Sequence, residues 1–339
     1  MEINKIECVT CKALHPDTLY PSDDQICVYC KADEAERLEQ PQVEEAAPEP
    51  TPEETAQLKA QKELALRALS RKHLLPFVER FNPDYLPGWV HKDICLRLEK
   101  FSQDVNDRKS PRLMLFMPPR HGKSTLASVA FPAWHLGKNP EHEFISCSYS
   151  GSLAMNFSRK VRQQLREPNF KNVFNGVSLD PSSQSVESWN TTKGGGYVAA
   201  GVGGGITGKG AHVLVIDDPV KNREDAESEY NRDAVWDWYT STAYTRLAPG
   251  GGVLVILTRW HDDDLAGRLL QAAAAGADQW EVVKYPALAE KDEEFREKGD
   301  ALHPERYSAE ALTQIQKAVG PRDWSALYQQ NPVSDEGEY

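Results

Sequence analysis

The sequence predicts an α/β fold of three layers, with a mostly parallel central sheet between two layers of helices. From residue 112 onward, short apolar runs alternate with longer amphipathic stretches. Strands that are apolar on both faces are typical of parallel sheets covered on both sides. A Gly-Lys-Ser sequence also stands between the first run and a helix-length segment. The predicted strands are 112–117, 144–149, 212–216, 252–257 and 280–285.

Other segments fill in this plan. Leucines among charged residues predict a helix from residue 58, broken at Pro76. The glycine-rich segment 188–210 predicts a hairpin followed by a loop, and one further helix is expected near 308–318. No internal repeat is visible in the sequence.

Composition narrows the function classes only a little. The chain has 339 residues, of which 40% are hydrophobic, enough for a large core. It contains no apolar run of membrane-spanning length and no signal-peptide pattern, so we expect a soluble intracellular protein. The net charge is −12, but ten acids against four bases in residues 31–65 account for half of it. The charge of the whole chain therefore does not exclude a nucleic-acid partner.

Four N-terminal cysteines have the spacing C-x₂-C-x₁₅-C-x₂-C, namely Cys8, Cys11, Cys27 and Cys30. In a chain without a secretion signal this spacing is typical of a structural zinc site, because four thiolates complete a tetrahedral shell. Paired disulfides would instead need an oxidising compartment. We expect a zinc finger with four cysteine ligands, and Cys95 and Cys147 as ordinary core residues.

The segment MPPRHGKST, residues 117–125, predicts a phosphate-binding loop between a strand and a helix. Met117 stands where the general motif has its first glycine. N–H groups at a helix N-terminus attract a nucleotide's phosphates, Lys123 would neutralise the β- and γ-oxygens, and the Ser124 hydroxyl would hold Mg²⁺. The alternative is a turn that merely uses glycine. The expected nucleotide-binding residues of this loop are Pro119, Arg120, His121, Gly122, Lys123, Ser124 and Thr125.

An Asp pair follows the apolar strand at 212–216. A metal-bound triphosphate needs a carboxylate at the end of a neighbouring buried strand. Asp217 fits the Mg²⁺-organising role, and Asp218 could orient or activate the attacking water. A pair that only caps the following segment is the alternative, but the pair and the loop together favour a nucleotide site.

The strand predicted at 252–257 ends in Thr258 and Arg259, which we expect beside the γ-phosphate, where they could sense hydrolysis. The next three acids precede the helical segment LAGRLLQAAAAG, so we predict that they cap this helix and do not bind metal. These acids are Asp262, Asp263 and Asp264.

These features divide the chain into four parts. A zinc finger is expected at 1–33, a solvated linker rich in Glu, Pro and Ala at 34–57, the α/β domain at 58–335, and the start of a connector at 336–339.

Over residues 75–335 the chain resembles the ATPase domain of phage large terminase subunits, the motors that pump DNA into a procapsid. The resemblance rests on MPPRHGKST, SCSYSGSLAMNFSRKVR, GGGITGKGAHVLVIDDPVKNREDAESE, WYTSTAYTRLAPGGGVLVILTRWHDDDLAGRLL and LYQQNP. It implies a P-loop NTPase fold of the ASCE type and ATP hydrolysis that translocates double-stranded DNA. In that family the first loop glycine is often absent and an arginine stands inside the loop, which implies that Arg120 contacts phosphate.

The family also has a trans-acting arginine that enters the neighbouring subunit's site from the segment before the Asp-bearing strand. This chain offers Thr207 and Lys209 there. The resemblance makes Lys209 the candidate, with Arg159 and Arg246 as alternatives, although a lysine cannot reproduce an arginine fork.

Two further assignments follow from the resemblance. Many terminases have Glu after the strand-end Asp, whereas this chain has Asp218, which is one methylene shorter and is implied to be the catalytic base. Adenine contacts are expected near PGWVHKDI, with Trp89 and His91 as candidates.

The implied partners are double-stranded DNA, a portal protein, a small terminase subunit and further copies in a ring on the portal. The implied place is the cytoplasm of an infected bacterium, with no membrane contact. The family normally continues into an RNase H-like nuclease domain, which is not recognisable after residue 290, so we expect either a shortened chain or a nuclease on another polypeptide. A helicase-like DNA-remodelling ATPase and a non-hydrolysing zinc-finger adaptor are the alternative functions.

Overall fold

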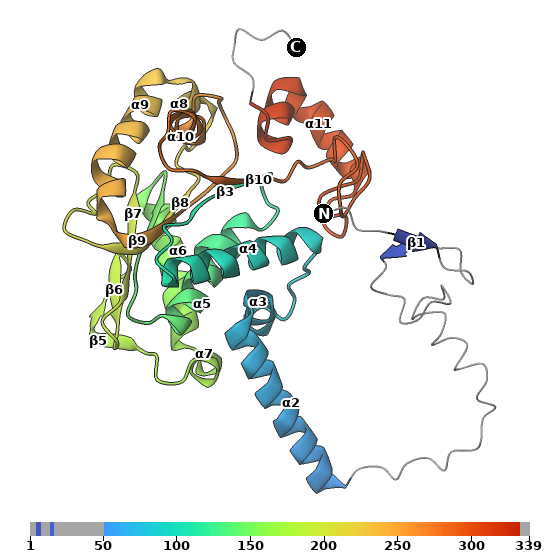
Figure 1. Ribbon diagram of the computed structural model, residues 1–339, viewed down its shortest axis with the longest axis vertical. Helices are drawn as coiled ribbons and strands as arrows, with labels where there is room; N and C mark the ends of the chain where they lie inside the picture. The colour runs from blue at the N-terminus through green and yellow to red at the C-terminus, as the bar shows by residue number, and fades with distance from the viewer. Residues whose placement is uncertain (1–4, 8–13, 17–50, 333–339) are drawn as a thin grey trace. The chain divides into compact units, whose positions relative to one another are not determined.

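The computed structural model describes residues 5–7, 14–16 and 51–332 (Figure 1). The chain divides into two compact units, Met1–Ala60 and Gln61–Tyr339. In the first unit, β1 (Lys5–Glu7) pairs with β2 (Leu14–Pro16) in a two-stranded antiparallel sheet. The four cysteines of the expected zinc finger lie outside the described residues.

The second unit is built on an eight-stranded sheet in the order β10-β3-β9-β8-β4-β7-β6-β5. The first six of these strands are parallel, and the last two add antiparallel pairs at one edge. The strands are β3 (Arg112–Phe116), β4 (Glu143–Ser148), β5 (Leu179–Gln184), β6 (Ser188–Thr191), β7 (Gly196–Gly201), β8 (Ala211–Asp217), β9 (Leu247–Leu257) and β10 (Glu281–Lys284).

The five predicted strands are confirmed as β3, β4, β8, β9 and β10, and β6 with β7 forms the predicted hairpin. β9 starts five residues earlier than predicted, because glycine and proline at its start read as a turn. β5 was not predicted, since Pro181 is tolerated only at a sheet edge of this kind. β9 lies between β3 and β8, which agrees with the ASCE type of fold.

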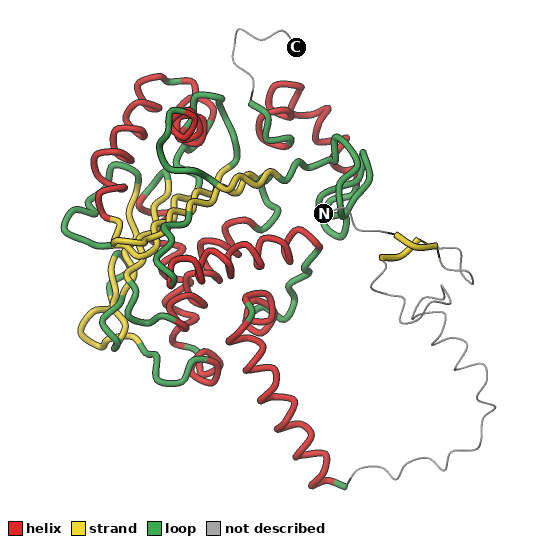
Figure 2. Tube along the Cα trace, viewed as in Figure 1, coloured by secondary structure: helices red, strands yellow, loops and turns green. Residues whose placement is uncertain are grey.

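Helices cover both faces of the sheet, as Figure 2 shows by the strands running between helical layers. On one face α3 to α7 pack over Leu115, Val215 and Leu254. On the other face α9, η3 and α10 pack over Phe116, Ile216 and Val255. The helices of the first face are α3 (Leu74–Phe81), α4 (Trp89–Asn106), α5 (Phe131–Lys138), α6 (Gly151–Arg166) and α7 (Pro168–Val173); those of the second are α9 (Glu229–Trp238), η3 (Tyr239–Ala243) and α10 (Leu265–Ala274).

The helix after the predicted phosphate loop contains a wide turn. Residues Thr125–Ala130 (η2) are π-helical and run directly into α5, with the Phe131 N–H bonded to the Leu126 carbonyl. Pro132 has no N–H to donate to the turn before it. The wider turn accommodates this missing donor, and π-turns of this kind are frequent at functional sites.

Helix α2 (Pro52–Lys72) begins inside the segment predicted as linker. Thr51 accepts the Glu54 N–H at 3.2 Å, and the Glu54 carboxylate accepts the Thr51 N–H at 2.7 Å. This capping box overrides the acidic, proline-rich composition. The linker prediction is therefore wrong for residues 52–57.

The C-terminal part of the second unit carries α11 (Ala309–Asp323), capped by Ser308 as predicted and kinked at Gly320, which has φ +82°. The remaining short elements are α8 (Arg223–Glu227), η4 (Tyr244–Arg246) and η5 (Trp324–Tyr328). Among the described helices, none has the length and apolar character needed to span a bilayer.

Candidate active site

The carboxyl ends of β3, β8 and β9 meet at one edge of the sheet, because these strands are parallel neighbours. A cavity of about 340 Å³ lies at this edge. It is lined by eight of the predicted site residues, Pro119, Arg120, Gly122, Lys123, Ser124, Thr125, Asp218 and Thr258. Segments that lie up to 141 residues apart therefore supply one pocket.

Lys123 is held at the floor of the cavity. Its side chain is 8% exposed, its Nζ lies 3.0 Å from Oδ2 of Asp218, and it donates to Oγ1 of Thr258. A buried ammonium is stable only where it is paired in this way. Its pairing places the lysine charge where the oxygens of a phosphate could replace these partners.

Asp218 has an unusual backbone conformation for a residue with a side chain, with φ +46°. Its N–H bonds to the Ile256 carbonyl at 2.9 Å, and its carbonyl accepts the Tyr149 N–H at 3.1 Å. Its Oδ1 accepts the Thr258 N–H at 2.9 Å. Strain of this kind persists where the surroundings over-determine the conformation, and it is concentrated at functional sites.

Asp217 lies beneath the cavity and is 1% exposed. Ser128 donates to its Oδ2 at 2.5 Å, while Oδ1 is buried without a hydrogen-bond partner. Burial and the neighbouring Asp218 charge raise the pKa of Asp217, against the smaller effects of Lys123, Ser128 and Ser124. An orphaned carboxylate oxygen beside the Ser124 hydroxyl is a hard oxygen donor set that fits Mg²⁺.

The loop itself follows a path that requires special residues. Gly122 has φ +92°, and an added Cβ would lie 3.3 Å from Nε2 of His91. Arg120 has φ +61° and is exposed at the cavity rim. The glycine that this loop needs is therefore the second one of the general motif, which the sequence retains.

Two predicted binding residues do not line the cavity. His121 is 1% exposed, its ring donates from Nδ1 to the Pro119 carbonyl at 2.9 Å, and its centroid lies 5.0 Å from that of Tyr307. Arg259 is 5% exposed and its Nε donates to Oδ2 of Asp264 at 2.6 Å. The predictions that these side chains contact the nucleotide are not supported by their positions, because both point into the protein.

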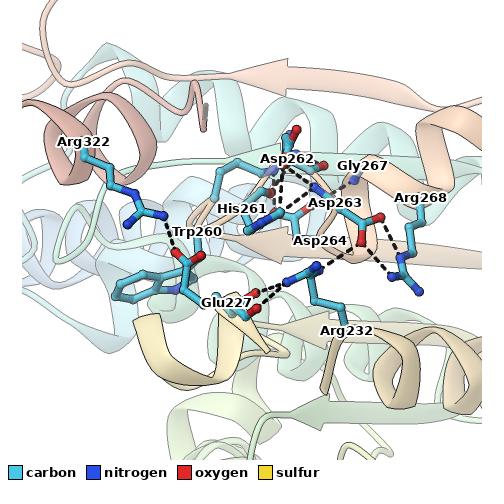
Figure 3. Close-up of polar contacts among 12 residues, drawn as sticks. Glu227, Arg232, Trp260, His261, Asp262, Asp263, Asp264, Gly267, Arg268 and Arg322 are labelled. Carbon is cyan, nitrogen blue, oxygen red and sulfur yellow. Dashed lines mark hydrogen bonds and ion pairs between the residues drawn. The ribbon is translucent and has the colours of Figure 1, made fainter. Parts of the chain in front are cut away.

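The three acids after Arg259 have separate roles (Figure 3). Asp264 caps α10 by accepting the Gly267 N–H at 2.9 Å, as predicted. Asp263 does not cap; it bonds to Arg268 at 2.8 Å and to Arg232 at 3.0 Å. Asp262 accepts from the Asp263 N–H.

The candidates for a trans-acting residue lie away from the cavity. Lys209 is exposed in the loop between β7 and β8, and Arg159 is exposed on α6. Arg246 directly precedes β9, at the edge of the sheet opposite the cavity.

Neither candidate for adenine contact lines the cavity. Trp89 stacks on Phe295 with ring centroids 5.1 Å apart. His91 is buried behind the phosphate loop. These two predictions are wrong for this pocket.

Several lining residues were not predicted: Tyr149, Val220, Lys221, Trp260 and Leu327. Tyr149 directly follows β4, so the rule that ligands bind at the carboxyl ends of parallel strands could have found it. Leu327 comes from η5 near the end of the described chain, and no local pattern indicates it.

Comparisons with known proteins agree with this geometry. Residues 114–328 match the family model described as terminase large subunit, T4likevirus-type, N-terminal. A search of curated proteins gave no match.

Solved structures of phage large terminases are also similar. The crystal structure of the HK97 bacteriophage large terminase gives a TM-score of 0.51 at 18% identity, over 77% of this chain and 55% of that one. Structures of the large terminase from a thermophilic bacteriophage, one without nucleotide in its description and one in complex with ATP-γ-S, give 0.44 and 0.39 at 10% identity, over 69% and 65% of this chain and 50% and 47% of theirs. The chain thus spans about half the length of the structures it matches, and the HK97 likeness establishes the fold.

Proposed function

The chain belongs to the T4-like family of terminase large subunits, in its N-terminal region, and on that premise we propose that it is an ATP hydrolase that drives DNA packaging. The observation that carries the proposal is the placement of Lys123 between Asp218 and Thr258 at the floor of the cavity. A loop lysine, a strand-end carboxylate and a third strand end converge there, as phosphoryl transfer to water requires.

In this proposal each residue has a distinct role. Lys123, with Arg120 at the rim, neutralises the β- and γ-phosphate oxygens, and Asp218 orients the attacking water and accepts its proton. Ser124 and Asp217 would hold Mg²⁺, which would neutralise charge on the phosphates. The water oxygen forms a bond to the γ-phosphorus as the bond to the β,γ-bridging oxygen breaks, so the protein supplies positioning and charge.

Thr258 is suited to report the presence of the γ-phosphate. Its hydroxyl accepts from Lys123 and donates to the Met117 carbonyl at 3.3 Å, while its N–H bonds to Asp218. A phosphate that draws Lys123 away removes one of these partners. We propose that this change starts the motion that moves DNA, through a two-state element.

Helix α6 supports the proposal that the partner is double-stranded DNA. Its 16 residues contain no acid, in a chain of net charge −12, and carry Arg159, Lys160, Arg162 and Arg166. No carboxylate of the described chain forms a salt bridge with any of the four. Unpaired cations on one helix are suited to phosphate contacts without sequence readout, and such binding weakens as salt rises.

The same helix connects the cation row to the nucleotide cavity. α6 is capped by Ser150, which follows the cavity-lining Tyr149. A shift at the cavity would therefore move the helix and any DNA bound to it.

We also propose the partners and setting that the family implies. These are a portal protein, a small terminase subunit and a ring of copies on the portal, in the cytoplasm of an infected bacterium. Lys209 is the proposed trans-acting residue, and its exposure is compatible with contact to a neighbour. A four-cysteine zinc finger at 1–33 remains proposed, as do the boundaries of the domain from 58 to 335 and the connector at 336–339.

The test of the enzyme proposal is ATP hydrolysis by purified protein with the variants Lys123→Ala and Asp218→Asn. Loss of positioned charge or of the base lowers kcat by about a hundred-fold or more. Arg166→Ala, remote from the cavity, should keep basal hydrolysis and weaken DNA binding. An ATPase rate unchanged in both cavity variants would support the non-hydrolysing adaptor instead, and ATP-driven strand separation would support the helicase-like alternative.

A further inference from the structure

A histidine lies directly behind the phosphate loop, and none of the roles proposed above uses it. His91, in the first turn of α4, is 2% exposed. Its Nδ1 accepts the Gly88 N–H at 2.9 Å, and its Nε2 lies 3.0 Å from the His121 carbonyl oxygen. One ring therefore joins the start of α4 to the middle of the loop, 30 residues later.

These two contacts fix the protonation state of the ring. Because a backbone N–H can only donate, Nδ1 must be the acceptor, and the proton of the neutral imidazole is on Nε2. Nε2–H then donates to the His121 carbonyl. The geometry thus defines a single tautomer that acts on a single loop carbonyl.

Holding that carbonyl also aims the next N–H. In a trans peptide the C=O and the following N–H point in opposite directions, since the unit is planar. The described chain contains no cis peptide. With the His121 carbonyl directed at His91, the Gly122 N–H is directed away from His91, and Gly122 lines the cavity.

The ring is itself held from several sides. Its centroid lies 4.5 Å from that of His303 and 5.5 Å from that of Tyr85. On the loop side, the space between Gly122 and Nε2 is too small for a Cβ without displacement. A rigid support of this kind keeps the loop in its binding conformation before any ligand arrives.

We propose that His91 is a positioning residue for phosphate binding: its Nε2–H holds the 121–122 peptide so that the Gly122 N–H faces the phosphates of a nucleoside di- or triphosphate. This inference rests on the nucleotide site proposed above. It gives His91 a purpose behind the loop, in place of contact with adenine.

The decisive comparison is between His91→Gln and His91→Asn. A glutamine amide nitrogen reaches the place of Nε2 and can keep the donor to the His121 carbonyl, whereas an asparagine reaches only the place of Nδ1 and loses it. We expect ADP affinity, measured by calorimetry, to stay within about three-fold in His91→Gln and to fall about ten-fold in His91→Asn, the value of one net hydrogen bond. KM for ATP should follow the same pattern, with kcat changed less, because the Gly122 N–H binds substrate and transition state alike.

The control is His135→Asn, which alters a fully buried histidine away from the loop and should lower thermal stability without changing ADP affinity. Equal ADP affinity in the wild type and His91→Asn, or equal losses in both His91 variants, would overturn the proposal. Wild-type protein that binds no ADP would instead refute the proposed function itself.

A measurement on the wild type covers the case in which a variant does not fold. In ¹⁵N-histidine spectra the His91 ring should carry its proton on Nε2, and this signal should shift when ADP is added. A proton found on Nδ1, or a His91 signal unmoved by saturating ADP, would rule the proposal out.

Discussion

Ser128 donates a 2.5 Å hydrogen bond to Oδ2 of Asp217, joining the helix after the phosphate loop to the end of β8, 89 residues later. Both side chains are buried, and the bond leaves Oδ1 of Asp217 as the oxygen without a protein partner. The serine therefore orients the carboxylate so that its free oxygen is the one available to a cation.

Ser128→Ala should weaken use of Mg²⁺ more than it weakens the fold. Removing the donor costs about 1–3 kcal/mol of unfolding free energy and frees the carboxylate to rotate. We expect the Mg²⁺ concentration for half-maximal ATPase activity to rise about ten-fold or more. Titrations of activity against Mg²⁺ at saturating ATP measure this.

Ser158→Ala is the matched control, because Ser158 is equally buried and its Oγ accepts from Trp189 Nε1 at 3.0 Å, on α6. It should lose stability and keep its Mg²⁺ dependence. If both serine variants shift the Mg²⁺ midpoint equally, the orienting role of Ser128 is wrong.

The pair of Arg259 and Asp264 is expected to be structural. Both side chains are less than a tenth exposed, and the guanidinium also lies over the Phe116 ring at 5.0 Å. Truncating one partner leaves the other charge buried, which costs about 3–5 kcal/mol. Asp264→Ser keeps a capping oxygen for α10 but removes the charge, so its loss in urea unfolding should fall in this range.

Lys100→Met provides the contrast, since Lys100 is 67% exposed and pairs with Asp104 on the surface. Surface pairs contribute about 0–1 kcal/mol. A loss in Asp264→Ser no larger than in Lys100→Met would show that the buried charge is solvated.

Sequence patterns predicted the sheet well because buried parallel strands are continuous apolar runs with a polar residue at the carboxyl end. The same rule predicts Lys123, Asp218 and Thr258 at one edge of the sheet, and all three line one cavity there. It failed for Arg259, because a strand-end residue can turn inward when a buried carboxylate such as Asp264 compensates its charge.

The unpredicted features depend on tertiary packing. His121 and His91 are separated by 30 residues, and only the folded chain shows that one ring holds the other's carbonyl. Leu327 reaches the cavity from η5, whose sequence carries no phosphate-binding signal. The start of α2 was not predicted for a local reason, since its capping box stands within an acidic, proline-rich composition that favours a linker.

His135 should make the protein sensitive to mild acid. It is fully buried between Ser102 Oγ at 2.8 Å and His142 Nδ1 at 3.1 Å, and burial holds its pKa well below the ordinary value, aided by the charges of His142, Lys138 and His212. Below about pH 6.5 the unfolded chain binds a proton at this histidine and the folded chain does not, so stability falls as pH falls.

The size of this effect follows from linkage. Between pH 7.5 and 5.5 one such histidine lowers the unfolding free energy by about 1.4 kcal/mol. His135→Gln should reduce the difference in unfolding free energy between these two pH values by about that amount, measured by urea denaturation. The comparison of variant with wild type cancels Asp217, whose raised pKa acts in the opposite direction. An unchanged difference would mean that His135 is protonated in the folded protein.

Gly137→Ala should destabilise the protein although alanine is the better helix former. Gly137 lies in α5, where replacing glycine by alanine would ordinarily add about 1 kcal/mol of stability. A Cβ there would lie 2.4 Å from Cδ2 of Phe174, a buried ring packed against Phe77 and Phe170. Because the ring cannot withdraw from a close-packed core, we expect a net loss of about 1–3 kcal/mol.

Gly205→Ala is the matched substitution, since a Cβ at this loop position meets nothing within 4 Å and its φ is not in the left-handed region. It should change the unfolding free energy by about 0.5 kcal/mol or less. Urea unfolding of both variants separates the two effects, because loss in Gly137→Ala alone identifies the contact with Phe174. A gain in Gly137→Ala would show that helix propensity outweighs that contact, and Phe174→Leu, which replaces the ring by a smaller side chain, should then no longer improve the variant.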